Sequence, residues 1–283
     1  MPSTVDALIL CHNRPDEVQL AVDSLDDGVR DTVVLDNGSS PPLPQLDGAR
    51  LLRSDDNTGV TRGRNLLLEA TDADYAIFID DDAVACSELA DVVRRHFDED
   101  PSLAVLAFRI TRPDGSVKLE HPFRGRPRDV DVARPCGYFV GAGYAVRTHA
   151  VASVGGYDDE LFYSTEEIDL SMALQRDGWT IRYEPALHVE HRPSTRGRGI
   201  APQVPAFIIR NRLVYVRRHL PLPLAVVHGC VWSALTLRSA LRARGVGAWA
   251  RAIRDGLRRP IERRPLSWAA LRTIHQRGGR VVF

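Results

Sequence analysis

Apolar runs recur along the first part of the chain and are separated by amphipathic or polar segments. Those at Val5–Cys11, Thr32–Leu35 and Tyr75–Ile79 predict strands buried on both faces. A shorter strand is predicted over Arg50–Arg53, and Asp16–Leu25 has the periodicity of an amphipathic helix. Strand, helix and strand at this spacing predict an α/β fold with a parallel, doubly wound sheet. Such sheets bind ligands beyond the carboxyl ends of their strands.

Similar segments continue to about residue 221. Further helices are predicted from the turn at Asn57–Asn65 through Ala70, over Ser87–Phe97, from Ser164 to about Arg176 and over Ala206–Arg218. Further strands are predicted over Leu103–Ile110, Ser116–Leu119, Gly137–Val146 and Thr180–Tyr183, with a hairpin turn at Gly115. Gly141 and Gly143 interrupt the third of these strands, and glycine inside a strand commonly marks close approach of backbone or ligand.

Three consecutive carboxylates follow the third buried run. Asp80, Asp81 and Asp82 begin where the apolar residues end, so they lie at a carboxyl end of the predicted sheet. In extended chain, Asp80 and Asp82 point the same way, about 6.6 Å apart, and Asp81 faces away. Carboxylates suit Mg2+ or Mn2+, which take further ligands from substrate phosphates. The pattern predicts a divalent-metal diphosphate site, with a solvated acidic turn as the alternative.

Two further polar segments lie at a strand end and at a helix start. Asp36 either faces the same cleft or forms the turn of an Asp-Asn-Gly-Ser loop. Gly59 opens a helix whose free N–H groups attract phosphate, and Arg62 and Arg64 add positive charge. This segment is neither a Walker A loop nor a GxGxxG motif.

Acidic residues recur at the start of the helix that is predicted to end near Arg176. Ser164 and Glu167 match a capping box, in which Glu167 would be structural. Alternatively, Glu166, Glu167 and Asp169 face the same cleft as the metal, and one of them is a general base. The sequence leaves both alternatives open.

Two histidines, His188 and His191, follow the last strand of this region. Side chains three positions apart on extended chain point to opposite faces, so at most one of them is expected to reach the metal.

Charge is distributed unevenly along the chain. Of 37 acidic and 37 basic residues, 35 acidic and 18 basic ones precede Arg192, which leaves 2 and 19 from Arg192 onwards, or net charges of −17 and +17. This division predicts an acidic body that holds metal and a basic tail that meets anions. The anion could be membrane lipid, the body's own surface or nucleic acid. Nucleic acid is the least favoured partner because the tail lacks its motifs.

The basic tail has helical periodicity in three segments, Leu224–Arg244, Ala248–Arg258 and Leu266–Arg277. Basic amphipathic helices can lie in a membrane interface, with Trp232, Trp249 or Trp268 near the headgroups. Alternatively, these helices pack on the acidic body or form a homodimer. The longest apolar run, Leu222–Leu237, includes His228 and is expected to be too short to span a bilayer comfortably.

The expected location is the cytoplasm, with peripheral attachment to the inner face of the cell membrane if the tail binds lipid. The four cysteines have no paired spacing, which argues against a zinc site or a disulfide framework. No positively charged segment precedes a long apolar stretch at the N-terminus, so no signal peptide is expected.

Taken in order, these motifs resemble the inverting nucleotide-sugar glycosyltransferases of family two, including rhamnosyltransferases, which have the glycosyltransferase A-type fold. The resemblance covers roughly Val5–Pro221. It rests on the common order of HNR at 12–14, VVLDNGSS, NTGVTRGRN, FIDDD, VGAGYAVR, GGYDDELFYSTEEIDL, YEPALHVEHR and RNRLVYVRRHLP. It implies a Rossmann-like, mostly parallel central sheet with flanking helices. The implied catalytic domain is 1–221, nucleotide-binding to about 110 and acceptor-binding beyond, followed by a basic helical extension over 222–283.

The resemblance also implies a role for each matching residue. The donor would be bound by Asn13, Arg14, Asp36, Asn57, Gly59, Arg64, Asp80, Asp81 and Gly141. The acceptor would be bound by Gly143, Tyr157, Asp158, Trp179, Arg210 and Asn211. Mn2+ or Mg2+ would be held by Asp80, Asp82 and His191. Glu166-Glu167-Ile168-Asp169 replaces the family's Glu-Asp-x-Asp. Glu167 therefore takes the place of the base with one extra methylene, and Glu166 or Asp169 could substitute because they share a helical face.

The implied reaction is transfer of a sugar from a uridine or deoxythymidine diphosphate donor to a hydroxyl of a glycan, a lipid-linked acceptor or a secondary metabolite. Metal would stabilise the leaving diphosphate while a carboxylate removes the acceptor proton, in one displacement with inversion.

Two alternatives belong to other classes. DDDAV also fits the motif of haloacid dehalogenase-type phosphatases, with Asp80 as nucleophile. That class needs a later lysine, and the one lysine, Lys118, falls in the predicted hairpin. The other alternative is a noncatalytic sugar-nucleotide or membrane-binding module.

Overall fold

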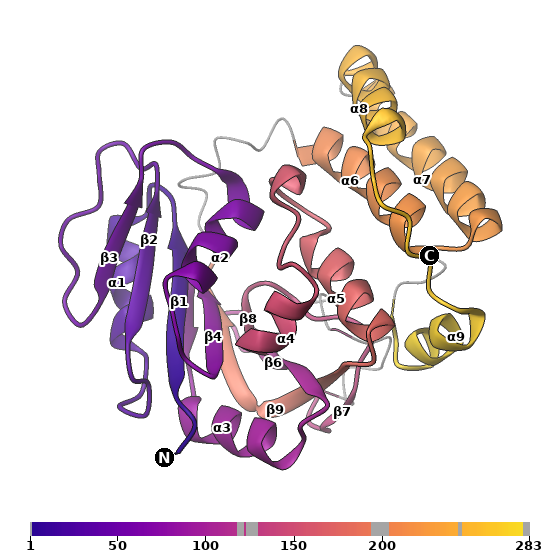
Figure 1. The fold of residues 1–283 in the computed structure, drawn as a ribbon. Coiled ribbons are helices and arrows are strands. Elements are labelled where there is room, and N and C mark those ends of the chain that lie inside the picture. The colour runs from indigo at the N-terminus through magenta and orange to yellow at the C-terminus, as the bar shows by residue number, and fades with distance from the viewer. Residues whose placement is uncertain (1, 118–121, 123–129, 194–203, 243–244, 280–283) are drawn as a thin grey trace.

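A computed structural model describes residues 2–117, 122, 130–193, 204–242 and 245–279. Within these ranges, one nine-stranded sheet has the order β3-β2-β1-β4-β8-β6-β9-β5, with β7 also paired to β9 (Figure 1). The strands are β1 Val5–Cys11, β2 Thr32–Asn37, β3 Arg50–Ser54, β4 Tyr75–Asp80, β5 Ala83–Ala85, β6 Leu103–Thr111, β7 Arg134–Pro135, β8 Gly143–Arg147 and β9 Thr180–His191.

The parallel register of the first strands brings the polar strand ends to one edge. β1 pairs in parallel with both β2 and β4, and Cys11 lies opposite Asp36 while Leu10 lies opposite Asp80. Beyond β4 the sheet is mixed, because β8 runs antiparallel to β4 and β6, whereas β6 and β9 are parallel. The predicted α/β class is confirmed, although part of the sheet is antiparallel.

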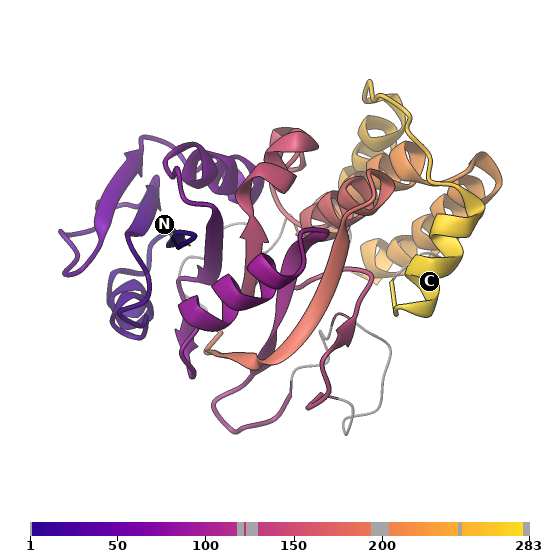
Figure 2. The ribbon, with the colours of Figure 1, turned by 60° about the horizontal axis from the view of Figure 1, so that its bottom comes forward.

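Helices cover both faces of this sheet (Figures 1 and 2). Buried residues of α1 and α3 pack into the core on one face, and those of α2, α4 and α5 pack into the core on the other. The helices are α1 Pro15–Asp23, α2 Gly59–Glu69, α3 Ala90–Glu99, α4 Thr148–Ser153, α5 Glu166–Arg176, α6 Val204–His219, α7 Leu222–Arg242, α8 Val246–Arg258 and α9 Trp268–Gln276, with a 3-10 turn, η2, at Asp159–Leu161.

The strand predicted over Gly137–Val146 is wrong in its first half. β8 begins at Gly143, whose N–H donates to the carbonyl of Val140 in a turn. Gly137 instead packs on the tail, where a Cβ would lie 2.5 Å from the Cα of Gly279. The glycines of this segment make room for neighbouring backbone and side-chain atoms, and sequence periodicity cannot distinguish such packing from a strand.

The strand predicted to end at Tyr183 continues as β9 to His191. It does so because β6 pairs along it in parallel and β5 pairs with its last residues. The predicted strand Ser116–Leu119 falls partly outside the described residues, as does Lys118; Val117 bridges to Thr111.

The tail helices pack on the body around α6. α8 packs on α6 through Ala252 and Leu213, and α9 contributes Leu271 and Ile274 to a cluster with Met172 of α5. Figure 1 shows α7 on the side of α6 remote from the sheet. The division of the chain at 221/222 stays a prediction.

α7 is longer than the apolar run that predicts it. It has 21 residues, and by length and composition it could cross a membrane. The expectation that this segment is too short is wrong, because the helix continues past Leu237 to Arg242. Residues 243–244 of the predicted helix lie outside the described ranges.

Gly59 is required where α2 begins. Its φ is +82°, and a Cβ would lie 2.6 Å from the carbonyl oxygen of Phe162. Gly59→Ala is therefore expected to lower the free energy of unfolding by more than the ~1–2 kcal/mol that a left-handed alanine costs, because the backbone at Phe162 must also move. Urea unfolding measures this loss. Gly115→Ala is the control, since Gly115 has φ +73° and no described atom would lie within 4 Å of its Cβ. Equal losses at both positions would contradict the packing argument.

Candidate functional site

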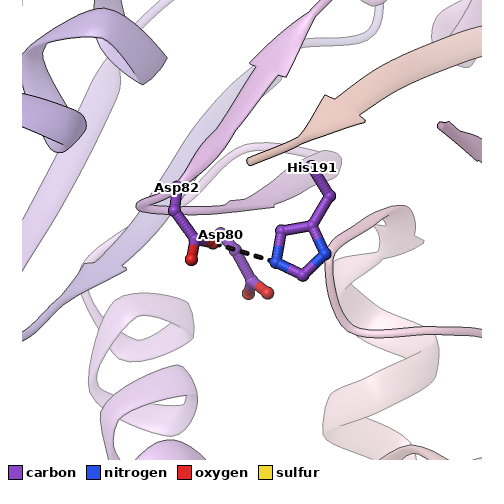
Figure 3. Close-up of side chains that lie close together, drawn as sticks. All are labelled: Asp80, Asp82 and His191. Atoms are coloured by element: carbon purple, nitrogen blue, oxygen red, sulfur yellow. Dashed lines mark ion pairs between the residues drawn. The ribbon is translucent and has the colours of Figure 1, made fainter. Parts of the chain in front are cut away.

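Asp80, Asp82 and His191 converge from the ends of two strands (Figure 3). β4 ends at Asp80, the chain turns, and Ala83 of β5 then pairs with His191 at the end of β9. One ligand atom from each of the three side chains lies within 4.8 Å of the others. His191 Nε2 is 3.1 Å from Asp82 Oδ1. The structure thus brings the three predicted metal ligands together, through a turn rather than an extended strand.

This donor set fits a divalent cation. Two carboxylates with one imidazole suit Mn2+, and Mg2+ also binds carboxylates when water completes its shell. Ligands about 2.1 Å from an ion lie up to about 4.2 Å apart, so a spacing within 4.8 Å needs only small side-chain rotations. The other histidine, His188, points elsewhere and bonds Thr111 Oγ1 at 2.8 Å.

Asp81 is turned toward β1. Its carboxylate accepts hydrogen bonds from Arg14 Nη1 at 2.5 Å and from the backbone N–H of His12 at 3.2 Å. Arg14 Nη1 also lies 2.9 Å from Asp82 Oδ2. Burial raises the pKa of Asp81 to about 7, with Arg14 acting in the opposite direction. Arg14 therefore joins the end of β1 to the acidic turn and offsets part of its negative charge.

Arg64 lies buried between the acidic turn and the start of α5. Its Nη1 is 3.3 Å from Glu167 Oε1 and 3.7 Å from Glu166 Oε1. Its Nη2 lies 3.8 Å from Asp80 Oδ1 and donates to the carbonyl of Gly141 at 3.3 Å. Arg64 thus lies between the carboxylate of Asp80 and those of Glu166 and Glu167. Its predicted contact with the nucleobase or ribose of a donor stays a prediction.

Glu166 and Glu167 are adjacent but have different surroundings. The side chain of Glu166 is 5% exposed and that of Glu167 is 20% exposed. Burial, with the neighbouring carboxylate of Glu167, raises the pKa of Glu166 to about 8. Glu167 is thus the one of the two that reaches solvent.

The predicted capping box is wrong. Ser164 and Thr165 both have positive φ, 72° and 79°, whereas a serine or threonine N-cap normally has extended backbone. Thr165 occupies the N-cap position and makes no side-chain capping bond. The strained turn aims the first residues of α5 toward Arg64, and Glu167 has no capping role.

Asp169 does not join the Arg64 cluster, although its spacing from Glu166 predicts a shared helical face. Its carboxylate accepts from His219 Nε2 at 2.9 Å and from Arg218 Nη1 at 2.6 Å. Burial acts to raise the pKa of Asp169, but these two partners lower it overall. Asp169 therefore holds α6 against α5, which leaves it poorly placed to substitute for the base.

Three of the predicted acceptor residues hold the loop between residues 157 and 165. Asn211 Nδ2 donates to three carbonyls of this loop, those of Leu161, Tyr163 and Ser164, each at 2.8 Å. Arg210 Nη2 donates to the carbonyl of Leu161 at 2.7 Å. Asp158 pairs with Arg218 and Arg259.

Of the other predicted acceptor residues, Tyr157 and Gly143 are buried in the body and Trp179 is half-buried against it. Tyr157 Oη is 2.6 Å from Tyr144 Oη in a buried pair. Gly143 lies in β8, where a Cβ would meet Val189 at 2.6 Å. Trp179 packs edge-on against His149 with 5.5 Å between ring centroids. None of these contacts tests acceptor binding, so the acceptor roles of these three residues stay predictions.

The remaining donor residues shape loops at the carboxyl edge of the sheet. Asp36 accepts from the N–H groups of Ser39 at 2.8 Å and Leu43 at 3.0 Å and pairs with Arg53, so it has the turn role that the sequence left open. Asn57 Oδ1 accepts from the N–H of Gly59 at 2.9 Å, and Asn13 Oδ1 accepts from the N–H of Ser40 at 2.8 Å. Contact with a donor stays a prediction for each of them.

The sequence did not predict which basic residues pair with Asp169 and with Glu160. Arg218 and His219 belong to the motif RNRLVYVRRHLP, but nothing in the spacing assigns them to Asp169. Arg259 lies in the tail and reaches Glu160 at 2.8 Å. The opposite charges of body and tail were the available signal for such pairs.

The mixed sheet, the acidic turn after β4 and the carboxylates at the start of α5 define a protein with the glycosyltransferase A-type fold. GalNAc-T7, solved with UDP, GalNAc and Mn2+, shares this fold with a TM-score of 0.59 at 11% identity, over 78% of this chain and 48% of that one. Residues 6–150, just over half of the chain, match the family model of glycosyl transferase family 2, so the chain belongs to that family.

Two curated relatives come from Mycobacterium tuberculosis. A pre-mycofactocin glycosyltransferase is 29% identical over 177 residues, which is 56% of this chain and 37% of that protein. An N-acetylglucosaminyl-diphospho-decaprenol L-rhamnosyltransferase is 31% identical over 112 residues, which is 39% of this chain and 36% of that protein. The chain thus matches little more than a third of the length of each relative.

The raised pKa of Glu166 predicts a pH dependence of stability. The unfolded chain loses this proton near the ordinary pKa of 4.5, whereas the folded chain keeps it to about pH 8. Folding is therefore increasingly disfavoured as the pH rises between these values. Glu166→Gln removes the contribution, so its stability relative to wild type should rise across that interval. Urea unfolding of both proteins at the low and the high end of this pH interval measures the difference in their free energies of unfolding. Glu88→Gln, at an exposed glutamate, is the control, and an unchanged difference between Glu166→Gln and wild type would argue against a neutral Glu166.

Proposed function

We propose that this chain transfers a sugar from a nucleoside diphosphate donor to a hydroxyl of an acceptor, with inversion and with Mn2+ or Mg2+ as cofactor. The observation that carries the proposal is the cluster of Asp80, Asp82 and His191, with Arg64 lying between Asp80 and the carboxylate of Glu167. UDP and Mn2+ in the name of the GalNAc-T7 structure support this ligand class.

Uridine or deoxythymidine is the proposed donor base. The acceptor is a glycan, a lipid-linked acceptor or a secondary metabolite, and the name of the mycobacterial rhamnosyltransferase, with its diphospho-decaprenol, supports the lipid-linked class. The proposed location is the cytoplasm.

The roles of the residues follow from their positions. Asp80, Asp82 and His191 would hold the cation, which supplies charge stabilisation to the leaving diphosphate. Arg14 offsets the remaining charge of the acidic turn. Glu167 accepts the proton of the acceptor hydroxyl. At the same time the hydroxyl oxygen bonds to the anomeric carbon, and the bond from that carbon to the diphosphate breaks.

Glu167 suits the base role better than its neighbours. A base must touch the acceptor, and Glu167 is more exposed than Glu166. Arg64 Nη1, 3.3 Å from Glu167 Oε1, holds this carboxylate in position. Asp169 is already paired with α6.

Neither alternative class is favoured. Membership of a glycosyltransferase family supports neither a phosphatase nor a noncatalytic module. Lys118, the lysine that a phosphatase would need, lies outside the described residues.

Replacing a metal ligand tests the cofactor. Asp82→Asn is expected to lower the release of nucleoside diphosphate from donor and acceptor at least about 100-fold, because charge stabilisation by a metal is worth several kcal/mol. It should also weaken Mn2+ binding in calorimetry with the metal alone. Asp27→Asn, at an exposed aspartate, should match wild type. Full activity in EDTA, or release of inorganic phosphate, would falsify the assignment.

Replacing the base tests the chemistry. Glu167→Gln is expected to lower kcat about 100-fold to 10,000-fold, the usual contribution of general-base catalysis, while donor affinity is retained. Glu167→Asp should recover part of the loss because it keeps the carboxylate. Asp169→Asn is expected to reduce stability more than turnover. Wild-type turnover by Glu167→Gln would reject the base, and donor titration of the same variant separates binding from catalysis.

A further inference from the structure

The outward face of α7 is apolar and uncovered. Five large side chains on this helix are more than half exposed: Leu222 at 64%, Val226 at 56%, Val227 at 51%, Leu235 at 56% and Leu241 at 61%. No residue between Leu222 and Leu237 carries a formal charge. Isolated exposed apolar residues are ordinary on soluble proteins, but several on one helix mark an interaction surface. We call these five residues the α7 outer face.

The opposite side of α7 is occupied by protein. Ala225 and His228 are buried there, and His228 Nε2 lies 3.2 Å from Arg212 Nη1 of α6. Trp249 Nε1 of α8 donates to Thr236 Oγ1 at 3.0 Å. A helix held in this way on one side cannot be surrounded by lipid. It presents one face to a partner, although its length alone would permit a span.

Arginines surround the α7 outer face in sequence. Residues 222–283 contain twelve arginines and two acidic residues, a net charge of +10. Five arginines on helices α7, α8 and α9 are exposed and make no ion pair within the described ranges. They are Arg238 and Arg242 at the end of α7, Arg251 and Arg258 on α8, and Arg272 on α9.

Charge selects among the partners that could cover this face. In a two-fold dimer the same patch meets itself, so the +10 tails of two copies would be brought together and would repel. An anionic lipid surface instead attracts exposed arginines and accepts apolar side chains below its headgroups. Trp268 on α9 is 59% exposed and has the side chain favoured at that depth.

We propose that the α7 outer face docks on the surface of an anionic bilayer, with α7 lying along the interface and the arginines of α7 and α8 on the headgroups. The partner is a membrane surface rather than a second copy of the chain. Docking does not depend on the transfer reaction, and it would bring the enzyme to lipid-linked acceptors.

Flotation of the full-length protein tests the proposal. The probes are vesicles of phosphatidylcholine with phosphatidylglycerol and vesicles of phosphatidylcholine alone. The protein should float with the anionic vesicles at low salt and be released at high salt, since screening weakens exposed charges. No flotation with anionic vesicles at low salt overturns the proposal, and so does equal binding to both kinds of vesicle.

Matched variants locate the surface. Leu235→Glu is expected to weaken vesicle binding about tenfold or more, the cost of losing one buried leucine. Leu20→Glu is the control, because Leu20 is 52% exposed on α1. Unchanged unfolding midpoints show that both variants fold. Equal binding by the two variants overturns the assignment to α7. A wild-type dimer that Leu235→Glu dissociates, without vesicle binding, overturns it in favour of a second copy.

Discussion

One buried guanidinium holds the carboxylates of the site in place. Arg64 contacts Asp80 at the end of β4 and both glutamates at the start of α5. Its carbon Cζ lies 5.4 Å from the ring centre of Tyr144, which adds a cation–π contact to a charge removed from water. Without this cation, the carboxylates of Asp80 and Glu167 would lie in a poorly solvated space with no positive charge between them, beside Glu166, whose pKa burial already raises. The geometry of sheet, acidic turn and α5 therefore depends on Arg64.

A second network joins the tail to the loop before α5. Asp158 pairs with Arg218 of α6 and with Arg259, which follows α8, while Asp169 pairs with Arg218 and His219. These bonds account for part of the charge division along the sequence, because tail arginines neutralise acids of the body. They also mean that α6 and the end of α8 set the position of the turn that aims Glu167. The tail thus has two sides, one that packs on the catalytic body and one that faces outward.

Strands were predictable from sequence because burial on both faces requires unbroken apolar runs, as in β1 and β4. The convergence of Asp80 and Asp82 was predictable because acids that directly follow a buried parallel strand lie at the edge where such sheets bind ligands. The place of His191 beside them was implied only by the family resemblance. Backbone torsions could not be predicted from the sequence. Ser164 and Glu167 have the spacing of a capping box, but the positive φ of Ser164 and Thr165 turns the chain differently. Pairings across long sequence separations, such as Asp169 with His219, also leave no local signal.

The extra methylene of Glu167 has a counterpart in the structure. A Cβ on residue 141 would lie 2.3 Å from Glu167 Oε1 and 2.5 Å from Arg64 Nη2, so a larger residue there would displace the ends of these two side chains. The strand-like pattern of Gly141 and Gly143 thus has two causes: Gly143 makes room for Val189 in the core, whereas Gly141 makes room for the candidate base. A shorter aspartate at 167 would withdraw its carboxylate from Gly141. Glycine at 141 and glutamate at 167 therefore form one steric unit, and the departure from the family pattern is compatible with the same chemistry.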